Sequence, residues 1–394
     1  MWWDRSLTFV NARVLGPDGH LASTLRVTRA RVDGLGVAPD RGDAVVDLQG
    51  AVVLPGLVNA HDHLELNTLP RLKWRDRHAN VREWIADFQP RFATDPRLRA
   101  LGPDTLDARV WVGGLKNLLA GVTTVCHHNP FHPVLRRRFP IRVVRRFTFS
   151  HSLQIDGDAL VRAHHATPPD QPWVVHAGEG VDADARSEIP RLQRLGCLDG
   201  RTVVVHGVAA CRATAQMMIE AGAGLVWCPS SNDWLFGTTA DVRPFDDADR
   251  LALGSDSRLS GAGDLLDELR AAFATRQVSA VGLTRLVTSG AASLLRLPDA
   301  GRLAPGAPAD VVVLGGSADD PYDVVVGASR SDVRLTMVDG LPAVADPGLR
   351  DVFAATRTPA IEARLDGAPR LVADWIGRRA AALGAAEPGL EVAA

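Results

Sequence analysis

Two histidines stand two residues apart directly after an apolar run, in the segment VVLPGLVNAHDH. Side chains at positions i and i+2 of a strand point to the same face, so His61 and His63 can bind one metal ion. Three further apolar runs also end in ionisable groups, in WVVHAGE, VVVHGV and LALGSD. Solvated loop histidines would explain a single pair. Four buried-looking strands that each end in His or Asp are difficult to explain by packing, and they predict a metal-dependent active site.

The elements that would position these groups alternate between two textures from about residue 57 to residue 299. β-like runs such as TTVCHHN and GLVWCPSS are separated by amphipathic, helix-like stretches such as CRATAQMMIEAG. This alternation indicates βα units around a parallel sheet. In a (β/α)8 barrel the carboxyl ends of the strands meet at one mouth, where active sites are built.

Short strand-like runs fill the two flanks of this central region. Residues 1–56 and 300–345 are rich in Val, Leu and Thr and are broken by Gly, Pro and Asp. The simplest arrangement is a small β domain built from both chain ends. For residues 346–394 we expect a C-terminal helical tail that frays at its end.

The composition is that of a globular protein, and several classes of partner are disfavoured. The 394 residues carry 44 basic and 46 acidic side chains, so no charge excess favours nucleic acid or an anionic membrane. No stretch approaches the roughly 20 apolar residues that cross a bilayer. The four cysteines are scattered, and the N-terminus lacks the plan of a signal peptide. We therefore expect a cytoplasmic enzyme with reduced thiols.

These motifs together resemble the amidohydrolase superfamily, in particular its branch of cytosine, guanine and thiomethyladenosine deaminases and triazine hydrolases. The resemblance begins at DLQGAVVLPGLVNAHDHLELN and continues through LAGVTTV, HAGEG, VHGV, CPSSN and LGSDS to GRLAPGAPADVVVL. It implies an α/β fold, a distorted (β/α)8 TIM barrel over residues 57–299. It also implies that both chain ends form a β-sandwich.

The resemblance also assigns roles to the strand-end residues. It implies metal ligation by His61, His63, His176 and Asp256. His206 matches the sixth-strand histidine, which acts catalytically on the activated water, with ligation as a secondary role. Glu179, in HAGEG, matches a glutamate that shuttles protons, and Asp256 would accept a proton from the water. A solvated loop carboxylate is the alternative for Glu179.

The scarcity of lysine bears on the number of metal ions. Binuclear relatives bridge two ions with a carboxylated lysine on the fourth strand. The only lysines here, Lys73 and Lys116, both precede the second-strand run. We therefore expect one divalent metal ion. Zinc fits three nitrogens, one carboxylate oxygen and an open position, and iron is the alternative because imidazole-rich sites also bind it.

Weaker signals surround the predicted pocket. Candidate substrate-binding residues follow the strand ends: Glu65, Asn67, His151, Gln154, Ser231 and Asn232. The long segment 64–92 is either a lid that carries recognition groups or an outer helix with an ordinary amphipathic face. His127 and His128 reach the pocket or support it from behind.

The predicted reaction is hydrolytic deamination of an aminated heterocycle through a metal-activated water. The alternative is hydrolysis of another C–N or C–X bond, in a cyclic amide, an imidazolone or a chlorinated ring, by the same residues. A non-catalytic scaffold is disfavoured because every expected ligand is retained. We expect a small molecule as the partner, and a homodimer as the assembly.

Overall fold

The computed structural model describes residues 6–92, 94–99, 105–136 and 138–392. The central region contains eight strands: β8 (Leu57–Asp62), β9 (Val122–His127), β10 (Arg142–Val143), β11 (Thr148–Ser150), β12 (Trp173–Ala177), β13 (Thr202–His206), β14 (Gly224–Trp227) and β15 (Leu251–Leu253). They form two parallel sheets, ordered β10-β9-β8 and β11-β12-β13-β14-β15. The amide of Asp256 donates to the carbonyl oxygen of His61 at 3.1 Å, which ties the end of β15 to β8. The α/β class and the parallel strands are confirmed.

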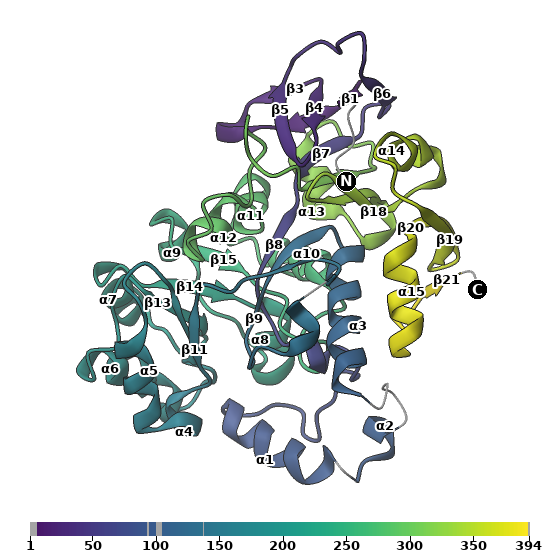
Figure 1. The fold of residues 1–394 in the computed structure, drawn as a ribbon. Coiled ribbons are helices and arrows are strands. Elements are labelled where there is room, and N and C mark those ends of the chain that lie inside the picture. Colours follow the sequence, from purple (N-terminus) through teal and green to yellow (C-terminus); the bar gives the residue numbers. More distant parts are fainter. Residues whose placement is uncertain (1–5, 93, 100–104, 137, 393–394) are drawn as a thin grey trace.

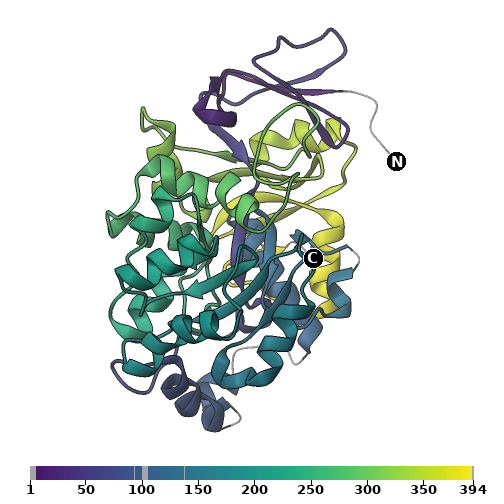
Figure 2. The same cartoon turned by 90° about the vertical axis from the view of Figure 1, so that its left-hand side faces the viewer.

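Strands β8, β9 and β13 are buried along their whole length, as expected when helices cover a parallel sheet. The helices of this region are α1 (Val81–Phe92), α2 (Pro96–Arg99), α3 (Leu106–Leu119), α4 (Leu153–Asp156), α5 (Asp158–Ala166), α6 (Ala183–Arg194), α7 (Arg212–Glu220), α8 (Pro229–Phe236), α9 (Arg243–Asp247), α10 (Leu265–Ala274), α11 (Ala280–Leu286) and α12 (Ser289–Leu294). Helix α1 lies at the end of the molecule opposite the N-terminal strands (Figures 1 and 2).

Two glycines allow the close approaches that the site requires. A Cβ at Gly113 of α3 would lie 2.3 Å from the carbonyl oxygen of Leu64, one residue after His63. A Cβ at Gly254, just after β15, would lie 2.7 Å from the Cβ of His61. Both contacts are too short for any larger residue, so helix α3 and strand β15 can pack directly against the histidine segment.

The outer region combines the two chain ends in one nine-stranded sheet, ordered β21-β19-β20-β18-β17-β16-β7-β2-β3. Its strands are β2 (Arg13–Leu15), β3 (Leu21–Ala22), β7 (Val52–Pro55), β16 (Val311–Leu314), β17 (Val333–Val338), β18 (Leu341–Ala345), β19 (Ala360–Leu365), β20 (Ala368–Ala373) and β21 (Leu390–Val392). A second sheet, ordered β5-β4-β1-β6, contains β1 (Leu7–Val10), β4 (Leu25–Thr28), β5 (Arg31–Leu35) and β6 (Ala44–Asp47).

The C-terminal segment differs from the predicted helical tail. It contains α14 (Arg350–Ala355) and α15 (Asp374–Leu383), and α13 (Pro321–Gly327) precedes it, but β19, β20 and β21 join the nine-stranded sheet. Asp366 and Gly367 turn β19 into β20 with φ values of 51° and 81°, the left-handed pair of a two-residue hairpin. Residues 1–5 and 393–394 of the predicted outer segments lie outside the described residues.

Candidate metal centre and active site

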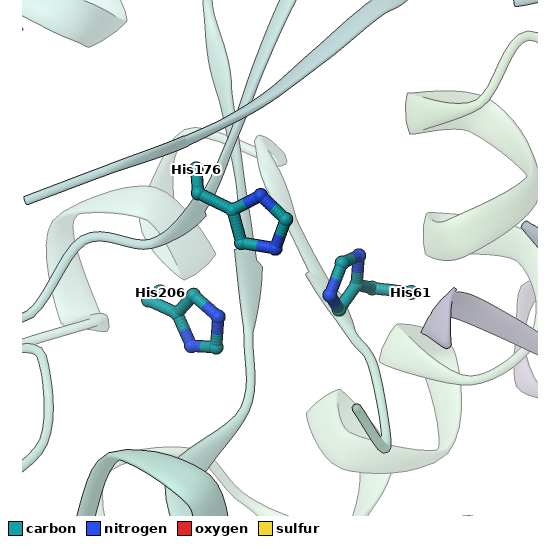
Figure 3. A group of neighbouring side chains, drawn as sticks. All are labelled: His61, His176 and His206. Carbon is teal, nitrogen blue, oxygen red and sulfur yellow. The ribbon is translucent and has the colours of Figure 1, made fainter. Parts of the chain in front are cut away.

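The predicted strand-end residues converge at one place. His61 lies in β8, His63 directly after it, His176 in β12 and His206 at the end of β13. The imidazoles of His61, His176 and His206 point toward one another (Figure 3). Their ring centroids lie 4.9 Å apart for His61 and His176, and 5.4 Å apart for His176 and His206.

The donor set fits a divalent metal ion. The ligand atoms of His61, His176 and His206 lie within 4.8 Å of one another, and so do those of His61, His63 and Asp256. Both ring nitrogens of His61 are buried without a hydrogen-bond partner among the described residues, as is Nδ1 of His63. Buried polar atoms are almost always satisfied. Unpaired nitrogens here are therefore expected of ligands prepared for a cation.

Hydrogen bonds behind the cluster orient these groups. Nδ1 of His176 donates to the carbonyl oxygen of His151 at 2.9 Å, and Nδ1 of His206 donates to Oδ1 of Asn232 at 2.9 Å. These bonds leave each Nε2 free to face the cluster, the arrangement typical of metal-binding histidines. His206 and Asp256 have φ values of 72° and 51°, and such left-handed strain in residues other than glycine is often found at functional sites.

The Asp256 carboxylate is held in its ionised form. Oδ2 accepts from the hydroxyls of Ser231 at 2.7 Å and Ser260 at 2.8 Å, and Oδ1 lies 3.9 Å from Nε2 of His61. Burial alone would raise the pKa of Asp256, but His206, His63 and the two hydroxyls outweigh it and hold the pKa at about 2. Burial also holds the pKa of His61 well below its ordinary value. A neutral imidazole and an ionised carboxylate are the protonation states that metal binding requires.

Glu179 lies beside this cluster rather than in solvent. Its Oε1 is 3.6 Å from Nε2 of His206, and the residue is 7% exposed. Burial, then the charges of Asp256 and Glu188, raises its pKa well above the ordinary carboxyl value. Glu188 accepts from the amide of Gly178 at 2.7 Å and so fixes the turn that carries Glu179. The structure therefore places a carboxyl group that favours its protonated form next to the cluster of histidines and Asp256.

The residues expected to bind substrate have different surroundings. His151 lines the cavity above the cluster. Ser231 and Asn232 instead hold Asp256 and His206, as described above. Glu65 accepts from Asn129, which lines the cavity, and lies 3.8 Å from His127.

Asn67 and Gln154 are absent from the described cavity lining. Asn67 donates to Oδ1 of Asp62 at 2.8 Å, and Gln154 donates to Oε1 of Glu188 at 2.9 Å. Both side chains are thus used within the protein. In the segment 64–92, helix α1 contributes Val81, Trp84 and Ile85 to the cavity wall, which supports the lid interpretation.

A buried polar network behind the cluster of histidines and Asp256 was not expected from the sequence. Nζ of Lys116, on α3, lies 3.2 Å from Oδ2 of Asp62, and both side chains are 0% exposed. The ammonium also donates to Oδ1 of Asn67 at 2.8 Å, to the hydroxyl of Ser255 at 3.0 Å and to the carbonyl oxygen of Asp256 at 3.1 Å. Lys116 therefore joins the first histidine segment to the loop that carries the carboxylate ligand.

His128 is a further residue of the site's interior. It is fully buried, and its ring centroid lies 4.4 Å from that of His176. Nε2 donates to the carbonyl oxygen of Ser150 at 3.0 Å. His128 thus packs against His176, one of the candidate metal ligands. Its neighbour His127 lies beside Glu65.

We expect the stability of the protein to carry a pH dependence from Glu268. This side chain of α10 is fully buried, accepts from the amide of Ser230 at 2.8 Å, and has a pKa raised by burial to about 7. The unfolded chain ionises this carboxyl from about pH 4.5, so its contribution to stability falls as the pH rises to 7. In urea unfolding, the free energy of unfolding of Glu268→Gln relative to that of wild type should increase by up to about 3 kcal/mol from pH 5 to pH 8.

The exposed Glu220, at the end of α7, provides the control for this measurement. Glu220→Gln should differ from wild type by the same amount at both pH values. An equal difference at both pH values for Glu268→Gln would contradict the assigned pKa.

The chain is similar to known hydrolases and deaminases. Residues 155–342 match the sequence model of the amidohydrolase family, so the chain contains an amidohydrolase domain. It is 29% identical over 361 residues to a 5-methylthioadenosine/S-adenosylhomocysteine deaminase of Halobacterium salinarum, covering 76% of this chain and 83% of the relative. A deaminase of the same description from Nitratidesulfovibrio vulgaris is 24% identical over 406 residues, covering 85% and 88%. The chain is thus similar to the deaminase-like branch of the superfamily.

Solved structures share the fold. An adenosine deaminase from Xanthomonas campestris with bound zinc superposes with a TM-score of 0.70 at 22% identity, covering 90% of this chain and 97% of that one. An atrazine chlorohydrolase from Arthrobacter aurescens TC1, complexed with zinc, has a TM-score of 0.72 at 20% identity, covering 89% and 99%.

Among the described residues, none of the helices has the length and apolar character needed to span a membrane.

Proposed function

We propose that this chain catalyses hydrolytic deamination of an aminated heterocycle. The observation that carries the proposal is the position of Glu179, a buried carboxyl 3.6 Å from His206 at the edge of the histidine and aspartate cluster. The deaminases found among the sequence relatives support the same reaction. A measurement of ammonia release would distinguish deamination from hydrolysis of a C–X bond, the reaction named for the structurally similar chlorohydrolase.

The residues proposed to hold the metal are His61, His63, His176 and Asp256, with His206 as catalyst. Zinc suits this set of nitrogen and carboxylate donors, and iron is the alternative. When bound, a divalent metal supplies Lewis acidity and makes water a nucleophile at neutral pH.

The chain's own groups would then move the protons. Oδ1 of Asp256 faces the histidines and would accept a proton from the attacking water. Nε2 of His206 would orient that water and stabilise charge that develops during attack. The protonated carboxyl of Glu179 would donate to the ring nitrogen or to the departing amine.

The proposed architecture is a distorted (β/α)8 barrel over residues 57–299, with a β-sandwich formed from residues 1–56 and 300–345. The bond between Asp256 and His61 supports closure between β15 and β8. The nine-stranded and four-stranded sheets, which draw on both chain ends, support the composite outer domain.

Glu179→Gln provides the test of the proposed reaction. General acid–base catalysis contributes roughly 10²–10⁴-fold, so turnover measured by ammonia release should fall by that factor. Metal content should stay at the wild-type level, because the amide keeps the shape of the side chain. Glu220→Gln is the matched control and should leave both quantities unchanged. Near-normal turnover of Glu179→Gln would remove Glu179 from the mechanism.

A further inference from the structure

The cavity next to the cluster of histidines and Asp256 has two chemically different surfaces. Its floor is formed by groups at or just after the strand ends, including Asn129, His151 and Glu179. Its walls come from helical segments and are apolar: Leu66, Val81, Trp84, Ile85, Ile155 and Leu235. The Trp84 indole N–H donates to the carbonyl oxygen of Leu72 at 3.3 Å, so this ring offers the cavity its apolar surface.

Lysine and arginine are absent from the described residues that line this cavity. Arginines nearby on the sequence or in the fold are engaged elsewhere. Arg71 donates to the carbonyl oxygens of Ser260 and Ser230, and its guanidinium lies over Trp234. Three others pair with carboxylates: Arg75 with Asp87, Arg82 with Asp184, and Arg258 with Glu387. The guanidinium of Arg77 lies against Gly237, at the end of α8. A carboxylate or phosphate packed against the apolar walls of the cavity would therefore meet no lysine or arginine side chain.

The size of the cavity sets a second limit. It encloses about 220 Å³, which is below the range of about 300–1,000 Å³ typical of sites for drug-sized ligands. One heterocycle with a short substituent suits this space better than a ring with a long polar chain.

We propose that the substrate is a small, uncharged aminated heterocycle that carries a short apolar substituent. This inference rests on the proposed deamination. The amino-bearing edge of the ring would face Glu179 and His151, and the substituent would pack against Trp84 and Ile85. An anionic substituent is excluded from this wall because it would lose its hydration there without gaining a cation, and burying an unpaired charge is costly.

The test uses matched pairs of aminated purines, pyrimidines, pterins and triazines with the metal-loaded protein. One member of each pair carries an N-ethyl group and the other an N-carboxymethyl group. For the rings that react, we expect kcat/KM to be about 100-fold lower for the charged member.

Three outcomes are distinguishable. Ammonia release with equal or greater kcat/KM for the charged members would overturn this inference and leave the proposed deamination intact. Ammonia from none of the compounds would overturn the proposed deamination. In that case the thermal shift of the protein with the same pairs decides the substrate class. Neutral members alone should raise the Tm, and a larger rise with the charged members would overturn the inference.

Two variants locate the effect in the cavity wall. Trp84→Ala should raise KM for the N-ethyl compounds about tenfold, whereas Trp375→Ala, the same change on α15, should leave KM unchanged. Ile155 is 57% exposed, so Ile155→Arg would place a cation at the rim. It should improve the kcat/KM of charged relative to neutral members by about tenfold. An unchanged ratio in Ile155→Arg, together with an unchanged KM in Trp84→Ala, would overturn the placement of the substituent.

Discussion

His61→Ala is expected to lose the bound metal and the catalytic activity together. His61 is fully buried, and its ring lies 4.9 Å from that of His63 and 4.9 Å from that of His176. Both of its nitrogens lack a partner among the described residues. Since metal catalysis supplies several kcal/mol of transition-state stabilisation, kcat/KM should fall by about 10³-fold or more.

Metal per chain, measured by mass spectrometry of the purified protein, is the second readout for this variant. The matched control is His78→Ala. His78 is also buried, but its Nε2 lies 3.2 Å from Oδ2 of Asp87, and it belongs to none of the described groups that could hold a metal ion. Both variants lose a buried imidazole, so both should be less stable than wild type. Only His61→Ala should lose metal. Normal metal content and turnover in His61→Ala would exclude the proposed centre.

The convergence of the strand-end histidines could be predicted because it depends on regular geometry. Alternation along a strand places His61 and His63 on one face, and the parallel order of β12 and β13 brings His176 and His206 to the same end. These relations hold whatever side chains fill the loops. Glu179 became a candidate in another way, through the resemblance of HAGEG to the deaminases and its place three residues after His176.

The side chains of the loops could not be predicted in the same way. Asn67 and Gln154 follow strand ends, yet their amides bond to Asp62 and Glu188. The choice between the cavity and these partners depends on contacts between distant segments. The hairpin at Asp366 and Gly367 is a different case, because Asp-Gly between alternating apolar residues is a local turn signal. The helical expectation for this segment overlooked that signal.

The buried contacts of Lys116 could not be predicted from the sequence. Its place in the sequence excludes it from bridging two metals, and it was assigned no other role. Its partners Asp62, Ser255 and the carbonyl oxygen of Asp256 come from β8 and from the loop after β15. Helix α3 meets both only in the folded protein, so no local pattern reports the contact.

Lys116→Met is expected to destabilise the protein by about 3–5 kcal/mol, the usual effect of removing one partner from a buried ion pair. The change leaves the Asp62 carboxylate 0% exposed with only amide and hydroxyl donors: Asn59, Asn67, Asn117 and Ser255. It also removes one of the two side-chain hydrogen bonds to the carbonyl oxygen of Asp256 and leaves the bond from the Ser255 hydroxyl at 3.0 Å. We therefore expect metal affinity to fall by roughly 10–100-fold, as when other groups that orient ligands are lost.

A double-mutant cycle with Asp62→Asn separates the charge from the packing. If the loss in Lys116→Met comes from an unpaired carboxylate, Asp62→Asn/Lys116→Met should recover most of the stability in urea unfolding. Lys73→Met is the control, because Lys73 donates to the carbonyl oxygen of Trp234 near the surface and forms no described carboxylate pair. A double variant as unstable as the sum of the single ones would show that Lys116 acts through packing. Recovered stability with weak metal binding would instead assign Lys116 to holding Asp256 in its left-handed conformation.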